Sequence, residues 1–444
     1  MEAVRSPRFA PEPAFPSELE DFTAGLHGSV VLPGDAEYDE ARQVHSAQYD
    51  RRPAAIVRAA DVDDVVHTVR FAREARLPFS VRGGRHSLAG FGVNDGGIVL
   101  DLGAMKGLHI DPVARTAWAQ PGLTAGEYTI AAAAHGLATP FGDTASVGIG
   151  GLTLGGGIGW LVRKYGMTID SLLAVEVVTA DGRVLTASPE SHPDLFWAVR
   201  GGGGNFGVVT RFQFRLHPVG TILGGALFLP ATPEVLRNLV PTAQAAPEEL
   251  TTITMVMRIP PMPFVPAEQV GRLSAIVMFV WAGEPGDGQA ALDPFRRLGT
   301  PLAEAVMPMP YPGIYQMLAE AEKRAYGTHR SRFLERIDDA AVEAILDAMA
   351  APSSPMAMIQ IRVLGGATAR VPADATAFAH RDAPVMLLVI TPYEDPSTEP
   401  VHVAWTVALH DALAANDAGV YSNFLEVEGD ARIRAAYPNG AYER

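Results

Sequence analysis

A histidine directly follows a glycine turn in the segment RGGRHS, residues 82–87. A neutral imidazole nitrogen is a nucleophile and a proton carrier near pH 7, so His86 could form a covalent bond or move a proton. Near the other end of the chain, YSNF at residues 421–424 offers the Tyr421 hydroxyl and the Asn423 amide. Taken singly, His86 could equally be a loop or packing residue, and Tyr421 a sheet residue whose hydroxyl is satisfied.

Three glycine-rich segments, 82–92, 148–159 and 201–207, each stand beside a predicted strand. Glycine lets backbone N–H groups approach a ligand closely, and such turns suit a pyrophosphate. Any one of the three could also be a tight turn in a crowded fold. Three of them in one half of the chain favour a large anionic cofactor that is held mainly by backbone groups.

The motifs disfavour several other classes of site. The segment GGGNFG, residues 202–207, matches the dinucleotide pattern G-x-G-x-x-G, but a predicted helix precedes it and a predicted strand follows, the reverse of a Rossmann site. The chain has no phosphate-binding loop of the P-loop type, and Thr144 stands where a hydrolase nucleophile elbow needs glycine. The 12 histidines form no H-E-x-x-H and there is no cysteine, so we predict no metal site.

The charge and hydropathy of the chain narrow its partners. The 444 residues carry a formal net charge of −15 without a Lys/Arg-rich run, and nucleic-acid binding requires clustered positive charge, so we expect no nucleic acid partner. No run of about 18 apolar residues indicates a membrane span, and MEAVRSPRFAPEPAF at the start has no apolar region typical of a secretory signal. We expect a cytoplasmic protein and leave its oligomeric state open.

The elements that must position these groups change character along the chain. Up to about residue 219, short strands alternate with helices, beginning with a strand at 54–59 and a helix at 61–76 that Asp61 caps. Beyond that point, alternating apolar strands are separated by amphipathic helices. This second pattern indicates an antiparallel sheet with helices on one face.

The motifs, in their order, carry a resemblance to a known family. Three segments resemble the FAD-linked oxidases of the vanillyl-alcohol-oxidase (PCMH) type. They are SVRGGRHSLAGFGVNDGGIVLDL (80–102), GDTASVGIGGLTLGGGIGWLVRKYGMTID (142–170) and DLFWAVRGGGGNFGVVTRF (194–212). The Tyr-x-Asn of YSNF is similar to the C-terminal motif of the berberine-bridge-enzyme-like branch. The resemblance covers roughly half of the chain.

The resemblance implies an α+β fold with two domains. The first is a two-lobed FAD-binding domain, and the second is a substrate domain whose antiparallel sheet is covered by helices. We place the FAD-binding domain at 1–219, the substrate domain at 220–400, and a C-terminal segment that returns to the FAD-binding domain at 401–444.

In the family, the histidine of the first motif is bonded to the 8α-methyl carbon of the flavin, and the matching residue is His86. Many members add a second bond through a cysteine at the position of Thr144. Because this chain has no cysteine, the resemblance implies FAD held by one covalent bond. Arg85 replaces a glycine of the family motif, and its side chain either points to solvent or pairs with a phosphate.

Further cofactor contacts are implied in the same segments. Arg82, Gly83, Gly84 and Ser87 are expected to wrap the pyrophosphate, and Val147 stands where this branch controls the access of dioxygen to the flavin. A valine there resembles the permissive oxidases. The whole predicted cofactor-binding set is Arg82, Gly83, Gly84, Arg85, Ser87, Gly122, Thr144, Ser146, Val147, Gly148, Gly150, Gly151, Gly157, Gly207, Val208, Val209 and Asn423.

Tyr421 is the candidate base that the resemblance implies. VYSNFLEVE (420–428) alternates, which predicts a strand that projects Tyr421 and Asn423 from one face toward the flavin. A free phenol has a pKa near about 10, so Tyr421 would need a positive neighbour or hydrogen bonds to accept a proton at neutral pH. Tyr393, at the end of the predicted strand 384–393, is a weaker candidate.

The implied function is an FAD-dependent oxidase of a small organic substrate: an alcohol, an amine or a phenolic natural product. Hydride would pass to flavin N5, and O2 would reoxidise the flavin and give H2O2. The alternatives are a flavin dehydrogenase with another electron acceptor and an oxidative cyclase of natural-product biosynthesis. A binding protein without turnover is not favoured, because Tyr421 and Asn423 are both present.

Overall fold

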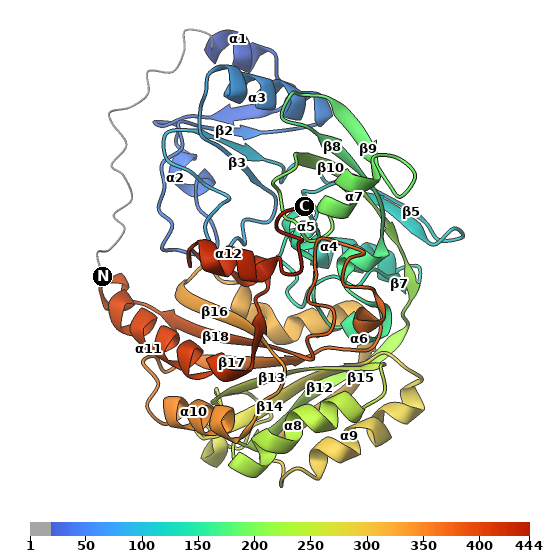
Figure 1. The fold of residues 1–444 in the computed structure, drawn as a ribbon, viewed down its shortest axis with the longest axis vertical. Coiled ribbons are helices and arrows are strands. Elements are labelled where there is room, and N and C mark those ends of the chain that lie inside the picture. Colours follow the sequence, from blue (N-terminus) through green and yellow to red (C-terminus); the bar gives the residue numbers. More distant parts are fainter. Residues whose placement is uncertain (1–18) are drawn as a thin grey trace.

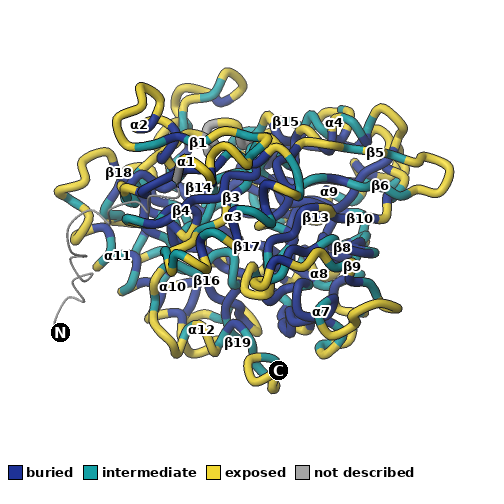
Figure 2. Tube along the Cα trace, turned by 90° about the horizontal axis from the view of Figure 1, so that it is seen from above, coloured by how far each residue is buried: buried dark blue, intermediate teal, exposed yellow. Residues whose placement is uncertain are grey.

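The computed structural model describes residues 19–444, which form three main sheets (Figure 1). The start of the chain, where the sequence predicted no secretory signal, lies outside the described residues. Among the described residues, no helix is long and apolar enough to cross a bilayer. The predicted α+β class is confirmed, and Figure 2 shows that buried residues run through the middle of all three sheets.

The first lobe is a four-stranded sheet with the order β1-β2-β4-β3, in which β2, β4 and β3 are parallel. Asp61 caps α3 as predicted, because its carboxylate accepts the N–H groups of Asp63 and Asp64. Val65 and Val69 of α3 pack on this sheet. Its elements are α1 (Leu19–Ala24), β1 (Ser29–Val31), α2 (Tyr38–Ala41), β2 (Ala55–Arg58), α3 (Val62–Glu74), β3 (Phe79–Arg82) and β4 (Ile98–Asp101).

The second lobe is an antiparallel sheet with the order β5-β6-β10-β8-β9. Segment 148–159, predicted to be a glycine-rich turn, instead begins with helix α5. A two-stranded pair, β7 and β11, lies beside this sheet. The elements are β5 (Leu108–Asp111), β6 (Thr116–Ala119), α4 (Ala125–Ala133), β7 (Leu137–Ala138), α5 (Ile149–Gly155), α6 (Val162–Tyr165), β8 (Leu172–Val178), β9 (Val184–Ala187), α7 (Pro193–Ala198), β10 (Val208–Arg215) and β11 (His217–Pro218).

The third sheet has eight antiparallel strands in the order β15-β12-β14-β13-β17-β18-β16-β19. Helices α8 to α11 cover one face, and the other face packs on the lobes, where Trp160 meets Ile253 (Figure 1). The elements are β12 (Thr221–Pro230), α8 (Pro233–Ala245), β13 (Leu250–Arg258), β14 (Leu273–Trp281), α9 (Gly288–Arg296), β15 (Ala303–Pro310), β16 (Tyr326–Leu334), α10 (Asp339–Ala350), β17 (Met358–Val363), β18 (Val385–Tyr393), α11 (Glu399–Ala412), β19 (Asp417–Gly419) and α12 (Asp430–Ala436).

The C-terminal segment leaves the third sheet later than the sequence predicted. Leu409 of α11 and Leu413 just after it pack in the core between this sheet and its helices, and β19 pairs with β16. Both elements therefore belong with the eight-stranded sheet, so the predicted boundary at residue 401 is wrong. The part that reaches the FAD-binding lobes begins after Gly419.

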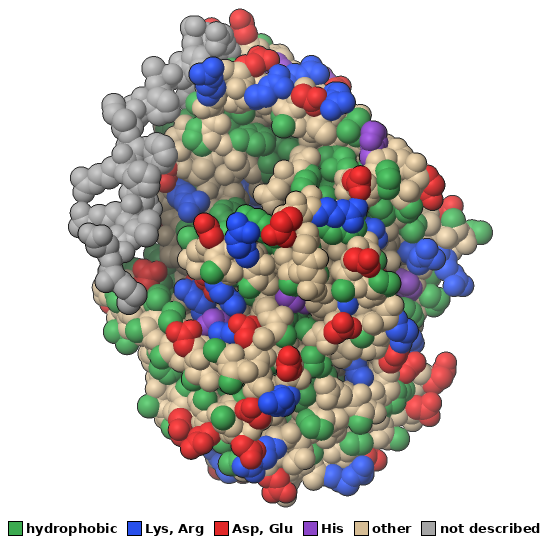
Figure 3. All heavy atoms as spheres, in the orientation of Figure 1, with side chains coloured by type: hydrophobic (Ala, Val, Ile, Leu, Met, Phe, Trp, Pro, Cys, Tyr) green, Lys and Arg blue, Asp and Glu red, His purple; other side chains and the backbone are tan. Residues whose placement is uncertain are grey.

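The face of the molecule in Figure 3 carries basic and acidic side chains that are interspersed with apolar ones. A nucleic-acid site needs positive charge gathered along one surface. This face does not gather charge of one sign.

The two lobes meet through an unusually close contact between main chains. A Cβ atom on Gly84 would lie 2.1 Å from the backbone nitrogen of Gly148, and one on Gly148 would lie 2.3 Å from that of Gly84. Real Cβ atoms do not approach backbone so closely, so both positions require glycine. The contact lays the loop after β3, which carries His86, directly against the loop that leads into α5.

Replacing Gly148 with alanine should therefore lower the free energy of unfolding by about 3 kcal/mol or more, because the Cβ meets backbone that cannot move aside. Gly151→Ala is the matched control in α5, since nothing lies within 4 Å of its Cβ. That change should stabilise the helix by up to about 1 kcal/mol. Denaturant unfolding of both variants measures the difference, and equal stabilities would contradict the contact.

Candidate active site

His86 lies half-buried at the junction of the lobes, with its ring held on two sides. Its Nε2 is 3.1 Å from the Ser146 hydroxyl, and its ring stacks on His45 with the centroids 4.2 Å apart. Burial lowers the pKa of His86 to about 3, and the charge of the His45 ring acts in the same direction. The His86 ring is therefore neutral at physiological pH, which is the nucleophilic form of imidazole.

Arg85, just before it, pairs with a protein carboxylate, a partner that the sequence did not predict. Its φ of 65° lies in the left-handed region that favours glycine. Its Nη2 is 2.9 Å from Asp101 Oδ2, and Arg82 Nη2 lies 2.7 Å from the same oxygen. The Arg82 side chain is buried inside the lobe, so the prediction that it wraps a pyrophosphate is wrong for the side chain.

Asp101 is the common partner of these two arginines. Burial acts to raise the pKa of its carboxyl group, but the charges of Arg82 and Arg85 and the N–H of Gly103 outweigh that effect, and the pKa is lowered. The carboxylate thus compensates two positive charges at the base of the loop that carries His86.

Tyr421 and Asn423 lie together, but not on the predicted strand. Residues 422–424 form a short 3-10 helix, so the prediction of a strand over 420–428 is wrong. The chain turns there against the end of α5 instead of continuing along the sheet edge. The Gly157 N–H donates to the Tyr421 hydroxyl oxygen over 2.7 Å, and Asn423 Nδ2 donates to it over 3.0 Å.

The glycines at the end of α5 make room for this C-terminal motif. A Cβ atom on Gly155 would lie 2.1 Å from Asn423 Oδ1, and Gly157 has a φ of 81°. The amide of Asn423 also donates to the Leu152 carbonyl over 3.1 Å. At these positions, glycine therefore serves the close approach of the protein's own chain.

The Tyr421 hydroxyl has an unused donor. Burial raises the pKa of Tyr421 to about 12, against the opposing effects of the Gly157 N–H, the Asn423 amide and the Arg362 charge. The hydroxyl oxygen accepts two hydrogen bonds, yet no described residue accepts one from it. The phenol therefore keeps its proton near pH 7, and it must lose that proton before it can act as a base.

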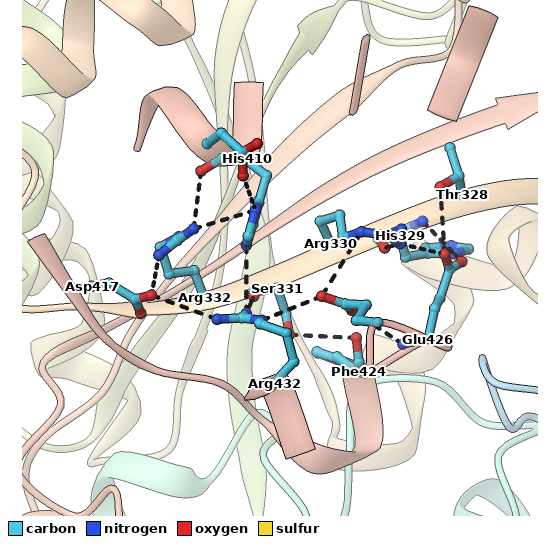
Figure 4. A network of polar contacts seen from close by, with 12 residues as sticks. Thr328, His329, Arg330, Ser331, Arg332, His410, Asp417, Phe424, Glu426 and Arg432 are labelled. Atoms are coloured by element: carbon cyan, nitrogen blue, oxygen red, sulfur yellow. Dashed lines mark hydrogen bonds and ion pairs between the residues drawn. The ribbon is translucent and has the colours of Figure 1, made fainter. Parts of the chain in front are cut away.

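A polar network fastens the C-terminal segment to β16 (Figure 4). The Glu426 carboxylate accepts the backbone N–H of His329 over 3.0 Å and also binds the Arg330 guanidinium. Arg432 Nη2 donates to the Ser331 carbonyl over 2.7 Å, so β16 is bonded on both sides of Phe424. These bonds hold the turn that presents Tyr421.

Sequence reasoning missed two residues of the site, Arg362 on β17 and Asp143. Arg362 Nη2 lies 2.7 Å from Asp143 Oδ2, which joins the third sheet to the loop before Thr144. The Phe424 ring lies 5.4 Å from the Arg362 guanidinium carbon and 5.2 Å from the Tyr421 ring. The only signal in the sequence was a charged side chain within the apolar strand MIQIRV.

Tyr393 does not join this site. Its ring stacks on His402 of α11, with the centroids 4.9 Å apart, and Thr391 on the same face bonds Thr406 of that helix. Because side chains alternate along β18, Tyr393 points to the helix-covered face of the third sheet. We therefore drop it as a candidate base.

A groove of about 760 Å³ opens between the two lobes, a volume within the usual range of small-molecule sites. Phe79 and Val81 of β3 expose apolar surface to it, segment 204–208 forms the opposite wall, and Arg73 and Arg76 add positive charge. An apolar slot with few polar groups is typical of a cofactor site. The chemistry of this lining suits the flat rings and the phosphates of FAD.

The other predicted cofactor residues surround the junction of the lobes. Ser87 Oγ accepts the Phe91 N–H over 3.2 Å, and Val209 packs into the core of the second lobe, away from any ligand. Gly207 and Val208 line the groove. Gly150 and Gly151 lie in the first turn of α5, and the loops beside Gly84 and Gly148 hold the remaining residues of the set, Gly83, Gly122, Thr144, Ser146 and Val147.

The comparisons with known proteins agree with this geometry. The family model of the FAD binding domain matches residues 53–188. The uncharacterised FAD-linked oxidoreductase YgaK of Bacillus subtilis (strain 168) is 32% identical over 413 residues, which cover 91% of this chain and 89% of that protein. The chain belongs to the FAD-linked oxidoreductases. The resemblance that the sequence motifs predicted is thereby confirmed.

A further relative and two solved structures are also similar to this chain. The (R)-6-hydroxynicotine oxidase of Paenarthrobacter nicotinovorans is 34% identical over 297 residues, 66% of this chain and 64% of that protein. The structure of 6-hydroxy-D-nicotine oxidase from Arthrobacter nicotinovorans superposes with a TM-score of 0.83 at 27% identity, covering 94% of this chain and 93% of that one. Physcomitrella patens BBE-like 1, at 21% identity and a TM-score of 0.85, covers 95% and 93% and shares the fold.

Replacing Asp101 with asparagine should lower the free energy of unfolding by about 3–5 kcal/mol at pH 7, because two guanidinium charges lose their counter-ion. The folded-state pKa of Asp101 is lowered, so its stabilisation is present above the unfolded pKa of about 3.9 and is lost as the pH falls through the folded value. Denaturant unfolding should show that the difference in free energy of unfolding between wild type and variant becomes smaller below about pH 4.

Arg85→Gly is the control for this measurement. It removes one partner of Asp101 but relieves a left-handed backbone, so the net change should stay within about 1 kcal/mol. A loss as large as that of Asp101→Asn would show that Arg85, and not the shared carboxylate, carries the stabilisation.

Proposed function

We propose that this protein is an FAD-dependent oxidase of a small organic substrate and that FAD is bonded to it through His86 alone. The observation that carries the proposal is the placement of two reactive groups along α5. The neutral His86 ring touches Ser146 before the start of the helix, and the Tyr421 hydroxyl bonds Gly157 just beyond its end. The absence of cysteine leaves no thiol for a second bond.

Helix α5 sets the separation of these two groups. Its seven residues span about 10 Å at a rise of ~1.5 Å per residue. A flat cofactor that is bonded to the protein at one edge and reacts nearer its other edge needs the bonding residue and the catalytic residue to be separated in this way. The name of the (R)-6-hydroxynicotine oxidase supports a small organic substrate and oxidase activity in the same family.

When bound, FAD supplies a hydride acceptor at N5 and, in an oxidase, passes the two electrons to O2 to give H2O2. The chain's own part is to hold the substrate and to move its proton. We propose that Tyr421 first loses its own proton to solvent and that the resulting phenolate takes the O–H or N–H proton of the substrate. The Gly157 N–H and Asn423 Nδ2, 2.7 and 3.0 Å from the phenol oxygen, stabilise that phenolate until the transfer returns it to the neutral phenol. Val147, half-buried beside Ser146, is the proposed gate for O2.

His86→Ala should abolish the covalent link, while an exposed histidine, His109, should be replaceable without effect. The measurement is denaturing gel electrophoresis with flavin fluorescence read in acid. The wild type and His109→Ala should keep a fluorescent band, and His86→Ala should show none.

Because the pKa of His86 is about 3, its protonation should not slow attachment to added FAD between pH 8 and pH 5. Wild-type protein that releases all its flavin on denaturation would refute the bond.

Anaerobic mixing with a panel of small alcohols, phenolic alcohols and amines should bleach the flavin, and air should restore its colour. Since the pKa of Tyr421 is about 12, the bleaching rate should rise about tenfold per pH unit between pH 7 and pH 10. Tyr421→Phe should remove this slope and slow bleaching by about 10²–10⁴-fold.

Val147→Leu is the variant that separates oxidase from dehydrogenase. It should slow the return of colour in air and leave the bleaching rate unchanged. Bleaching that air does not reverse in the wild type would reject the oxidase and favour a dehydrogenase with another acceptor.

A further inference from the structure

Arg362 is a buried charge on the face of the third sheet that meets the FAD-binding lobes. Along β17, Ile359, Ile361 and Val363 pack into the core beneath the helices. The alternation of the strand therefore turns Gln360 and Arg362 to the opposite face. The Arg362 side chain is only 5% exposed.

The guanidinium of Arg362 has donors to spare. Its Nη2 donates to Asp143 Oδ2 over 2.7 Å and to Gln360 Oε1 over 2.8 Å. Its Nε and Nη1 are buried and have no hydrogen-bond partner among the described residues. Buried donors without an acceptor are costly, and a bound group with oxygen acceptors would remove that cost.

The surroundings of Arg362 are apolar except for its partners. Ile253 and Met386 lie opposite it on the neighbouring strands, and Met255 and Leu388 lie opposite Gln360. Phe424 contacts both Arg362 and Tyr421, so the spare donors belong to the same site as the free phenol. An apolar wall with one polar pair is the usual form of a small-molecule site.

We propose that Arg362 donates hydrogen bonds to the reacting oxygen of the substrate and that the site therefore takes alcohols in preference to amines. The inference rests on the proposed oxidase function and refines its substrate class. Asp143 and Gln360 occupy Nη2 and orient the guanidinium, which leaves Nε and Nη1 for the substrate. The alcohol loses its O–H proton to the Tyr421 phenolate and its C–H hydride to the flavin, and O2 is the final oxidant.

The charge that develops during oxidation explains the preference. As an alcohol loses its proton and hydride, negative charge grows on oxygen before the carbonyl is complete, and preorganised N–H donors stabilise it. An amine that loses hydride becomes a positively charged iminium, which a fixed guanidinium repels. The same residue thus assists one substrate class and opposes the other.

A chromophoric phenol tests this without turnover. We would titrate 4-nitrophenol into the holoenzyme over a range of pH and read the yellow phenolate by difference absorbance. Bound to the wild type, it should ionise about one pH unit or more below the free probe, because the donors favour the charged oxygen. Arg362→Gln should remove this shift, and Arg362→Lys should keep part of it, since a lysine retains the charge without the planar fork.

Arg163→Gln is the matched control for loss of a buried arginine. Arg163 is as buried, and its Nε also has no partner in the part of the chain that the structure describes, but it donates to carbonyls of α8 and β13, among them Ala243 and Leu250. This variant should be destabilised and keep the 4-nitrophenol shift. A bound probe that ionises at or above the pH of the free one, absence of binding to the wild type, or loss of the shift in Arg163→Gln would overturn the proposal.

Flavin reduction by matched alcohols and amines separates this inference from the proposed function. With 1-phenylethanol and 1-phenylethylamine as one pair of the panel, the alcohol should reduce the flavin faster. Arg362→Gln should slow the alcohol by about 10²–10³-fold and leave the amine unchanged or faster. If only amines reduced the flavin, the role of Arg362 would be rejected and the proposed oxidase function would be kept. Reduction by no member of the panel would count against the proposed oxidase, and the 4-nitrophenol titration would still decide on Arg362.

Discussion

The site depends on main chain packed against main chain where Gly84 meets Gly148. The two backbones approach so closely that no side chain fits at either position. This contact lays the His86 loop against Ser146 and aligns it with the start of α5. At the other end of the same helix, Gly155 and Gly157 admit the C-terminal motif by a similar approach. One short helix between two glycine contacts thus sets the distance between the covalent and the acid–base candidates.

Ion pairs and charged hydrogen bonds also hold the loops and the C-terminal segment that carry the site residues. Asp101 balances Arg82 and Arg85 under the His86 loop, and Glu426 and Arg432 tie the C-terminal segment to β16. The ion pair of Arg362 with Asp143 links the third sheet to the loop before Thr144. The first group of contacts lies within the first lobe and the second lies on β16, so of these contacts the Arg362–Asp143 pair is the one that joins the third sheet to a lobe.

Local patterns predicted much of the fold. Asp61 was recognisable as a helix cap because capping is a local hydrogen bond, and the antiparallel sheet with its helices followed from alternation. The prediction of a strand at 420–428 failed because an alternating pattern does not tell a strand from a turn that packs on α5. Tyr393 was misplaced because the sequence shows alternation along β18 but not which face meets the flavin side.

The sequence by itself determined the family, the α+β fold and the histidine, tyrosine and asparagine that stand in its motifs, because those depend on residue type and order along the chain. Only the tertiary structure decided that Arg85 pairs with Asp101, that α5 separates His86 from Tyr421, and that Arg362 is buried with two donors that have no partner among the described residues. These facts join residues from distant parts of the chain, and contact between such residues is set by packing and burial, which no local pattern contains.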